Sequence, residues 1–407
     1  MPSSMFNLAN AIVGAGVLTL PFAIKSTGLI LGLTLLLLFA LLSSYSLLLL
    51  DSSCRITGAK TYAELGRVVY GGETKEEKIA GERIEYAVEV LQSLYSYGAC
   101  VGYLQIVVSE LVVVTGYSGR FLLLLCCLCV VFPLSLMKNL QSLSFTSLCA
   151  IICVAYLSVV IVVRYEDGGD SLGYEECSLG SGSVVDAAFG KGLFTSLPIF
   201  CFAFNCQVQF LPLVAELKGG REEGGETKVL CLIFGVMCGV CGLYCLDASV
   251  GYLSFCEDTL NNILDCYGED DVLIKISRIG FVVTLMFSFP LYSTAVVTSV
   301  HSLTSSSSSS RGLSFGRRIS LATIIVGSMA VIVSFDPPLD AVLGLTGAIG
   351  GCSLVYVFPG LFYCRAVRKM KGGGGNGRGG GKVALALVLA IGGGLLGVSC
   401  TFAILIG

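Results

Sequence analysis

The chain is poor in ionisable side chains, because only 13% of its 407 residues are charged and His301 is its single histidine. A membrane-embedded transferase needs paired acids for a metal ion, or a base such as histidine near the membrane face. The sequence has no acid-rich pair of that kind, and no carboxylate falls deep enough in an apolar run to be an obvious proton relay. These absences disfavour an enzyme and predict neither a resident cofactor nor a nucleic-acid partner.

The 19 cysteines lack the spacing of a zinc or redox site, since no CxxC pair falls in a polar loop. Most lie inside apolar runs, where a thiol behaves as a small apolar group. Three fall in predicted outer loops, and Cys177 could form a disulfide with Cys256 or Cys266, or all three could be free thiols. The sequence also has no Asn-x-Ser/Thr motif, so N-glycosylation is not expected.

Long hydrophobic runs dominate what is present. Hydrophobic residues make up 55% of the chain and the mean hydropathy is +0.86, which is more apolar surface than a soluble domain could bury. A bilayer-spanning helix needs about 20 apolar residues. Runs near that length predict an all-α polytopic membrane protein with 11 transmembrane helices, at 6–26, 29–50, 86–114, 121–137, 143–163, 193–214, 229–253, 273–300, 319–335, 341–364 and 383–406.

The distribution of basic residues predicts the orientation. If the N-terminus is cytosolic, the loops after helices 2, 4, 6, 8 and 10 hold 19 of the 25 lysine and arginine residues, as the positive-inside rule requires. This orientation places the loop at 54–83 and the Gly-rich linker at 372–381 in the cytosol, and the loop at 165–191 outside it. We expect an integral multi-pass protein in the bilayer of the plasma membrane or of a vacuole or lysosome.

The spans can be divided into two sets of five plus one. Residues 6–163 and 193–364 form the two sets, 383–406 is an extra helix, and all belong to one domain, 1–407. Because five is odd, the second set is inverted relative to the first. The first helix of each set, helix 1 and helix 6, is interrupted by Gly or Pro residues. Interrupted segments at matching positions in the two sets indicate a transporter site at the bilayer midplane. Chance placement of Gly and Pro is the alternative.

Helix 1 carries the string FNLANAIVGAGVLTLPFA at 6–23. Unwinding at Gly14, Ala15 and Gly16 would free N–H groups that suit a substrate carboxylate. Carbonyls that end the preceding half-helix, such as that of Val13, suit a cation such as Na⁺, and Asn10 offers an amide oxygen one turn earlier. The alternative is that the glycines permit close helix packing and the asparagine makes an interhelical hydrogen bond.

Helix 6 contains TSLPIFCFAFNCQVQFLP at 195–212. Asn205, like the neighbouring glutamines, must face protein or water, because burying an amide without a partner is costly. Phe202 and Phe204 could cover the apolar side chain of a substrate. Aromatic surface with neutral polar groups favours a small zwitterion that has a neutral side chain. Ordinary core packing with Asn–Gln cross-links is the alternative.

Two further groups of residues complete the candidate site. On helix 8, Thr284 and Ser288 share a face, and either hydroxyl could complete the oxygen shell of an ion, or instead bond its own backbone four residues earlier. Glu110, Asp247 and Arg278 are ionisable residues inside spans. They could form an outer gate in which Arg278 pairs with one of the two acids, or they could simply extend to the lipid headgroups.

Taken together, these segments resemble the amino acid/auxin permease family, in particular its sodium-coupled neutral amino-acid transporters and vacuolar amino-acid transporters. Besides the helix 1 string, the matching strings are TGAKTYAELG at 57–66, LSLMKNLQSLSFTS at 134–147, FAFNCQVQFLPLVAEL at 202–217, GYLSF at 251–255 and LGLTGAIGGCSLVYVFPGLFYCR at 343–365. The resemblance covers nearly the whole chain.

The resemblance implies eleven helices in a five-plus-five inverted repeat with discontinuous helices 1 and 6, a cytosolic N-terminus and alternating access driven by an ion gradient. In the sodium-coupled branch it implies an ion site at Asn10 and at Ser288, with Thr284 as the reserve position. One departure is Cys206-Gln207, where the family often has Cys-His, and this weakens any expectation of pH sensing there.

The function that the sequence favours is ion-coupled secondary active transport of neutral L-amino acids, with Na⁺ or H⁺ as the coupling ion. A transporter-like receptor that senses amino acids without moving them would have the same sequence features. A membrane-embedded transferase is a weaker alternative, for the reasons given above. A channel is disfavoured because no polar stripe or ring of like charge runs through several helices.

Overall fold

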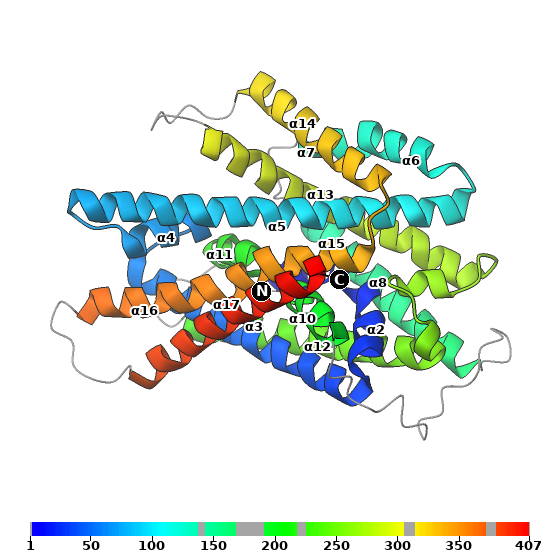
Figure 1. Ribbon diagram of the computed structural model, residues 1–407, viewed down its shortest axis with the longest axis horizontal. Coiled ribbons are helices and arrows are strands. Elements are labelled where there is room, and N and C mark those ends of the chain that lie inside the picture. Colours follow the sequence, from blue (N-terminus) through cyan, green and yellow to red (C-terminus); the bar gives the residue numbers. More distant parts are fainter. Residues whose placement is uncertain are drawn as a thin grey trace.

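The computed structural model describes residues 2–136, 143–167, 191–217, 225–304, 314–371 and 380–406, and within these ranges it contains helices and no strand. Nine helices among the described residues are long and apolar enough to cross a membrane, and one bent pair near the N-terminus makes a tenth candidate. The predicted all-α polytopic class agrees with this arrangement (Figure 1). The predicted partner Cys177 and most of the loop at 165–191 lie outside the described ranges.

The first span is broken, as predicted. Helix α1 (Pro2–Ile12) ends before Gly14, α2 (Gly16–Thr27) begins after it, and their axes differ by 47°. At the end of α1 the Val13 N–H donates a hydrogen bond to the Ala9 carbonyl. At the start of α2 the Val17 N–H donates to the Gly14 carbonyl, and this hydrogen bond is long, at 3.4 Å. Two glycines around one alanine leave little side-chain packing to hold a regular turn here.

The sixth span is broken as well. Helix α10 (Lys191–Ala203) and α11 (Gln207–Glu216) are separated by the non-helical residues 204–206. Cys206, which precedes α11, has a φ of −139°, outside the helical range. Each half-helix also contains a proline, Pro198 and Pro212, which removes a backbone donor from its helix. Both discontinuities therefore fall where the sequence placed them.

Polar ends lengthen several spans beyond their apolar runs. Helix α3 (Leu29–Thr57) continues seven residues past the predicted end at residue 50, and α5 (Lys75–Thr115) begins eleven before its predicted start at 86. A capping box formed by Thr74 and Glu77 stabilises the early start of α5. Between them lies α4 (Tyr62–Tyr70), capped by Thr61, so the loop predicted at 54–83 is largely helical.

Five more long helices lie further along the chain. These are α8 (Leu143–Glu166), α12 (Glu226–Phe255), α13 (Val272–Thr304), α14 (Phe315–Ser334) and α17 (Gly380–Ile406). Two 3₁₀ turns, η3 (Cys256–Asp258) and η4 (Ile263–Cys266), connect α12 to α13. Cys256 is disulfide-bonded, whereas Cys266 is a free, buried thiol, so Cys266 is not the bridging cysteine.

Two spans are irregular. The fourth consists of α6 (Gly119–Cys126), the π-helical turn η1 (Cys127–Val131) and α7 (Phe132–Ser135), and its apolar helix is shorter than a full span. The tenth runs from α15 (Leu339–Thr346) through two π-helical turns, η5 (Gly347–Gly351) and η6 (Ser353–Val357), into α16 (Phe358–Lys371). The count of eleven spans therefore stays a prediction.

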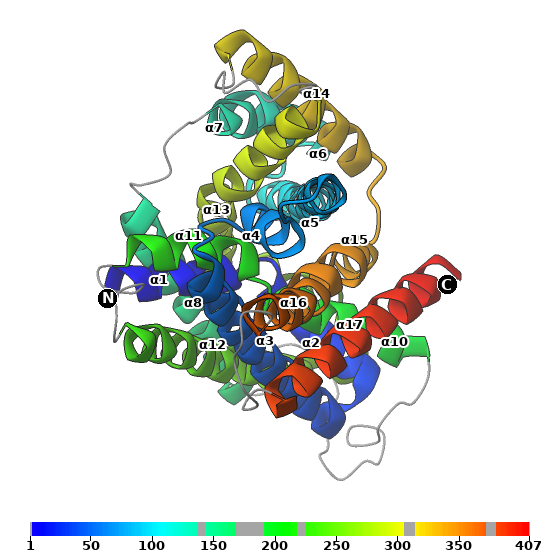
Figure 2. The same ribbon diagram turned by 90° about the vertical axis from the view of Figure 1, so that its left-hand side faces the viewer.

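Helix α5 organises the bundle. Its 41 residues correspond to about 60 Å of helix at 1.5 Å per residue, and it crosses the full width of Figure 1. Helix α13 packs along it. Helices α2, α3 and α12 pack against one another, and α10 packs against α2 and α3. Figure 2 shows α17 at the edge of the bundle, where it packs against α16.

Candidate functional site

The two breaks meet in the interior of the bundle. If Gly16 carried a Cβ atom, that atom would lie 3.1 Å from the Cα atom of Ala203, which ends α10. The Tyr244 hydroxyl on α12 lies 3.0 Å from the Ile12 carbonyl oxygen and 3.3 Å from that of Ala203. One hydroxyl thus touches the carbonyl ends of both α1 and α10, which have no intrahelical donor beyond the break.

The break in helix 1 presents backbone donors that no carbonyl engages, although the Gly14 N–H contacts the Tyr244 hydroxyl. Among the described residues, the N–H groups of Gly14, Ala15 and Gly16 donate to no backbone carbonyl. Ala15, the residue before α2, also supplies no side-chain cap. These three N–H groups and the positive end of the α2 dipole make this point suitable for a carboxylate.

Tyrosine side chains that the sequence analysis missed surround the break. A Cβ atom at Gly14 would lie 2.3 Å from the Tyr103 hydroxyl oxygen, and the Tyr292 hydroxyl donates to the Ala11 carbonyl at 3.4 Å. The rings of Tyr103 and Tyr292 are 5.4 Å apart, and Tyr95 contacts both Tyr292 and Phe202. A tyrosine inside an apolar span is itself a signal, because its buried hydroxyl requires a polar partner.

Asn205 is the polar side chain of the helix 6 break. It is 2% exposed, and neither its amide nitrogen nor its amide oxygen has a hydrogen-bond partner among the described residues. Phe204 packs on Tyr244 with ring centroids 5.3 Å apart, and Phe202 packs on Tyr95. A buried amide without a partner is unusual, so Asn205 is available to a ligand.

Gln207 has a structural role that its sequence position did not indicate. Its side-chain oxygen accepts from the Cys206 N–H at 2.9 Å, and its amide nitrogen donates to the Ser43 hydroxyl at 2.9 Å. The Ser43 hydroxyl in turn donates to the Phe204 carbonyl at 2.8 Å. This chain of bonds satisfies the backbone of residues 204–206 and holds helix 6 open.

Each of the four predicted ion-site residues keeps an oxygen that accepts no hydrogen bond from a described residue. Asn10 is 3% exposed and donates from its amide nitrogen to the Ser147 hydroxyl at 3.2 Å, while its oxygen has no partner. The Ser288 hydroxyl is equally buried and unpartnered, and the Val13 carbonyl accepts no hydrogen bond from any described residue. Thr284 differs, because its hydroxyl donates to the Gly280 carbonyl at 2.9 Å.

Comparison with known proteins decides the family. Residues 1–377 match the sequence model of a family described as Transmembrane amino acid transporter protein. The chain belongs to this family. A sodium-coupled neutral amino acid symporter 2 from Danio rerio is 27% identical, over 90% of this chain and 75% of that protein. The protein is therefore a multi-pass transporter of the amino acid transporter family and not an enzyme.

Solved transporters share the fold. A manganese transporter from Eremococcus coleocola, in complex with an aromatic bis-isothiourea compound, superposes with a TM-score of 0.53 over 100% of this chain and 93% of its own, at 12% identity. A Na⁺-coupled sialic acid symporter in a substrate-bound, outward-open state gives 0.55 over 100% and 88%, also at 12%. These likenesses confirm the predicted fold class with its two broken helices.

The buried ions of this transporter form a cluster beside one end of the bundle. Arg278 on α13 forms a salt bridge with Glu110 on α5, and both side chains are at most 2% exposed. Arg278 also donates to the Leu264 carbonyl at 2.6 Å, and Asn262 donates to Glu110 at 2.6 Å. Asp265 lies 3.5 Å from the guanidinium. Of the two acids that the sequence offered to Arg278, the structure uses Glu110.

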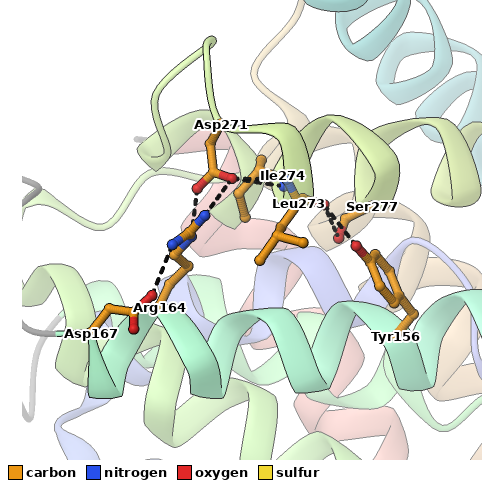
Figure 3. A network of polar contacts seen from close by, with 7 residues as sticks. All are labelled: Tyr156, Arg164, Asp167, Asp271, Leu273, Ile274 and Ser277. Carbon is orange, nitrogen blue, oxygen red and sulfur yellow. Dashed lines mark hydrogen bonds and ion pairs between the residues drawn. The ribbon is translucent and has the colours of Figure 1, made fainter.

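A second ionic network joins the ends of α8 and α13 (Figure 3). Arg164 contacts both Asp271 carboxylate oxygens, at 2.6 and 2.8 Å, and donates to Asp167 at 2.8 Å. Asp271 also accepts from the Leu273 N–H at 2.9 Å, so it caps the first turn of α13. Burial alone would raise the pKa of the Asp271 carboxyl, but the bonds from Arg164 and the backbone outweigh burial and lower it.

This network predicts an acid-sensitive contribution to stability. Because the pKa of Asp271 is lowered on folding, its contribution is present above the unfolded value of 3.8 and is lost as pH falls through the folded value. We expect Asp271→Asn to destabilise the protein by about 0.5–1 kcal/mol at neutral pH. Melting curves of purified protein should show this difference shrinking in acid. Asp167→Asn, at a more exposed position, should have a smaller effect, and an equal loss in both variants would contradict the assignment.

Proposed function

We propose that the chain is a Na⁺-coupled symporter of neutral L-amino acids that works by alternating access. The observation that carries this proposal is that the two broken spans meet at Gly16 and Ala203. Backbone N–H groups that no carbonyl engages and the unpartnered amide of Asn205 lie at the two breaks. Discontinuous helices in matching positions are how transporters of this architecture expose backbone groups to a cargo within the bilayer. Membership of the amino acid transporter family and the sodium-coupled relative support the same conclusion.

The substrate side of the site is assigned to the two breaks. The N–H groups of Gly14, Ala15 and Gly16 bind the α-carboxylate, and the Asn205 amide binds a polar group of the same molecule. Phe202 and Phe204, with the neighbouring tyrosines, cover the side chain. Neither break contains a charged side chain, and a charged substrate side chain would find no counter-ion there. The substrate class is therefore neutral amino acids.

The ion side is assigned to neutral oxygen atoms. The Asn10 amide oxygen, the Val13 carbonyl and the Ser288 hydroxyl are oxygens near the end of α1 and on α13 that accept no hydrogen bond from a described residue. Hard, uncharged oxygens of this kind suit Na⁺, and none of them can carry a transferable proton at ordinary pH. Thr284 is the reserve ligand, because its hydroxyl donates to the Gly280 carbonyl and keeps the lone pairs of its oxygen for a cation.

Glu110 and Arg278 are assigned to closure of the outer side. With the N-terminus in the cytosol, the repeats at 6–163 and 193–364 are inverted relative to each other, and the Glu110–Arg278 pair lies toward the outer face. Its complete burial supports a conformation closed on that side. The extra helix at 383–406 belongs to neither repeat. We assign the protein to the plasma membrane or to a vacuolar or lysosomal membrane.

Uptake driven by one gradient at a time tests the proposal. Purified protein in proteoliposomes should accumulate radiolabelled neutral amino acids when an inward Na⁺ gradient is the only driving force. Replacing Na⁺ by K⁺ should abolish accumulation, and arginine or glutamate should not compete. Accumulation with a pH gradient alone and no dependence on Na⁺ would contradict the assignment of the ion.

Asn10→Ala is expected to weaken ion binding specifically. The variant loses one oxygen ligand, so the Na⁺ concentration for half-maximal uptake should rise about 5–30-fold, which corresponds to about 1–2 kcal/mol. Na⁺ titrations of uptake at saturating amino acid measure this shift. Ser147→Ala is the matched control, because it removes the group that orients Asn10 and leaves the oxygen itself. An unchanged Na⁺ dependence in Asn10→Ala would remove this residue from the ion site.

A further inference from the structure

Asp247 is a buried acid that neither the ion site nor the outer cluster uses. It lies on α12, is 1% exposed and forms no ion pair with any lysine, arginine or histidine that the structure describes. One carboxyl oxygen is 2.9 Å from the Ser158 hydroxyl on α8, and the other has no partner. The sequence placed Asp247 near the headgroups, but the structure encloses it between two helices.

The hydrogen bonds of Ser158 fit a protonated form of this acid. The Ser158 hydroxyl oxygen lies 2.9 Å from Asp247 and 3.1 Å from the Val154 carbonyl oxygen, yet a hydroxyl has one proton to donate. If Asp247 were ionised, Ser158 would donate to it and would give up its contact with the Val154 carbonyl, which keeps its helical N–H donor. If Asp247 carries a proton, it donates to Ser158 and Ser158 donates to Val154, so both contacts are hydrogen bonds.

Among the described residues, none supplies a charge that would favour the ionised form of Asp247. The titratable groups that interact electrostatically with Asp247 are two tyrosines, Tyr244 on α12 itself and Tyr267 after η4. On α8, Arg164 is already bound to Asp167 and Asp271. A carboxylate enclosed with one hydrogen bond and no cation is strongly disfavoured in a bilayer-spanning protein.

The basic side chains on α2 and α13 are bound to other partners. Lys25, at the end of α2, donates to the carbonyl oxygens of Glu257 and Thr259. Arg278 on α13 is held by Glu110 and the Leu264 carbonyl. Ionisation of Asp247 therefore requires that α12 move away from α8 so that water can reach the carboxyl group.

Asp247 is mechanically connected to the candidate site. Tyr244 lies three residues earlier on the same helix, and its hydroxyl contacts the carbonyl ends of both broken spans. Residues three apart on a helix lie on one face. A displacement of α12 that exposes Asp247 also withdraws Tyr244 from the Ile12 and Ala203 carbonyls.

We propose that Asp247 is a proton-binding site, protonated in this closed conformation and deprotonated when α12 separates from α8 and the two breaks lose their Tyr244 contact. Protonation then favours the closed conformation, and acid slows uptake by reducing the population of open molecules. The effect on uptake rests on the proposed transport function, whereas proton binding at Asp247 does not.

Infrared difference spectroscopy tests proton binding without any transport assay. Purified protein taken from mildly alkaline to mildly acidic pH should show the carbonyl stretching band of a protonated, shielded carboxyl group. The band should disappear in Asp247→Asn and shift in frequency in Ser158→Ala, because its hydrogen bond is lost. Ser249→Ala is the matched control, since that hydroxyl bonds only within its own helix. The same band in wild type and Asp247→Asn, or no band at all, would overturn the proposal.

The pH dependence of uptake tests the coupling. Wild-type uptake should fall as pH is lowered, whereas Asp247→Asn, whose amide can donate to Ser158 at every pH, should be slow and independent of pH. Asp258→Asn removes an acid from the neighbouring turn η3 and should keep the wild-type profile. A wild-type pH profile in Asp247→Asn would contradict the coupling between proton binding at Asp247 and uptake. Proton binding itself is tested separately by the infrared experiment.

Discussion

Arg278→Met is expected to destabilise the folded transporter by about 3–5 kcal/mol, the largest single effect that the structure predicts. The substitution keeps much of the side-chain volume but leaves Glu110 as a fully buried carboxylate with Asn262 as its remaining partner. Apparent melting temperatures of the purified protein measure the loss. A drop of the same kind is expected for Glu110→Gln, which leaves the guanidinium without its main counter-ion.

A double variant tests whether Glu110 and Arg278 stabilise the protein as a pair or independently of each other. In Glu110→Gln with Arg278→Met neither charge remains, so the double variant should be more stable than the sum of the two single losses predicts. Losses that simply add would show that the two side chains do not depend on each other. Arg164→Met is a useful comparison, because its partners are more exposed and its loss should be smaller.

Gly16→Val should abolish most uptake while the protein still folds and inserts. The first added carbon would lie 3.1 Å from both the Cα and the Cβ atom of Ala203, and the two methyl groups beyond it would separate α2 from α10. Overpacking of this kind costs about 1–3 kcal/mol, and about 1.4 kcal/mol corresponds to a factor of ten. We expect initial uptake to fall by about tenfold or more.

Gly242→Val is the matched control for this prediction. Gly242 lies in α12, and an added Cβ atom there would meet nothing within 4 Å. Its uptake and its elution profile in size-exclusion chromatography should be close to those of the wild type. Normal uptake in Gly16→Val, with equal amounts of protein in the membrane, would contradict the assignment of the break as the binding site.

The positions of both breaks were predictable because local sequence decides them. Gly14 and Gly16 weaken the helix because they have no side chain. Asn205 lies in an apolar run, where an uninterrupted helix would have to bury its amide. Such signals are local, so they survive without knowledge of the packing. The family resemblance fixed the order of the spans in the same way, through strings that lie along nearly the whole chain.

What the sequence could not show depends on contacts between distant segments. Tyr244 is more than two hundred residues from Ile12, yet its hydroxyl touches the carbonyl of that residue. Gln207 was one of the amides that the sequence required to face protein or water, and its partner is Ser43 on α3, through which it braces helix 6. The sequence predicted two acids, Glu110 and Asp247, at about the same depth in the membrane as Arg278. Only the packing of the helices could decide which of them Arg278 contacts.

Span boundaries were less predictable for a related reason. Hydropathy locates the part of a helix that is in lipid, whereas caps such as Thr74 with Glu77 decide where a helix begins. The fourth span shows the reverse case, in which an apolar run at 121–137 does not produce a regular helix but a π-helical turn at Cys127–Val131. Apolar composition sets a length, and backbone hydrogen bonds decide the geometry within it.

Counterflow in proteoliposomes tests the central claim most directly, because it requires a carrier that binds its cargo on one side and releases it on the other. Vesicles loaded with unlabelled neutral amino acid and equal Na⁺ on both sides should transiently accumulate labelled amino acid, in wild type and not in Gly16→Val. Na⁺-dependent binding of amino acid without any counterflow would instead identify a sensor, and would contradict transport through the broken spans.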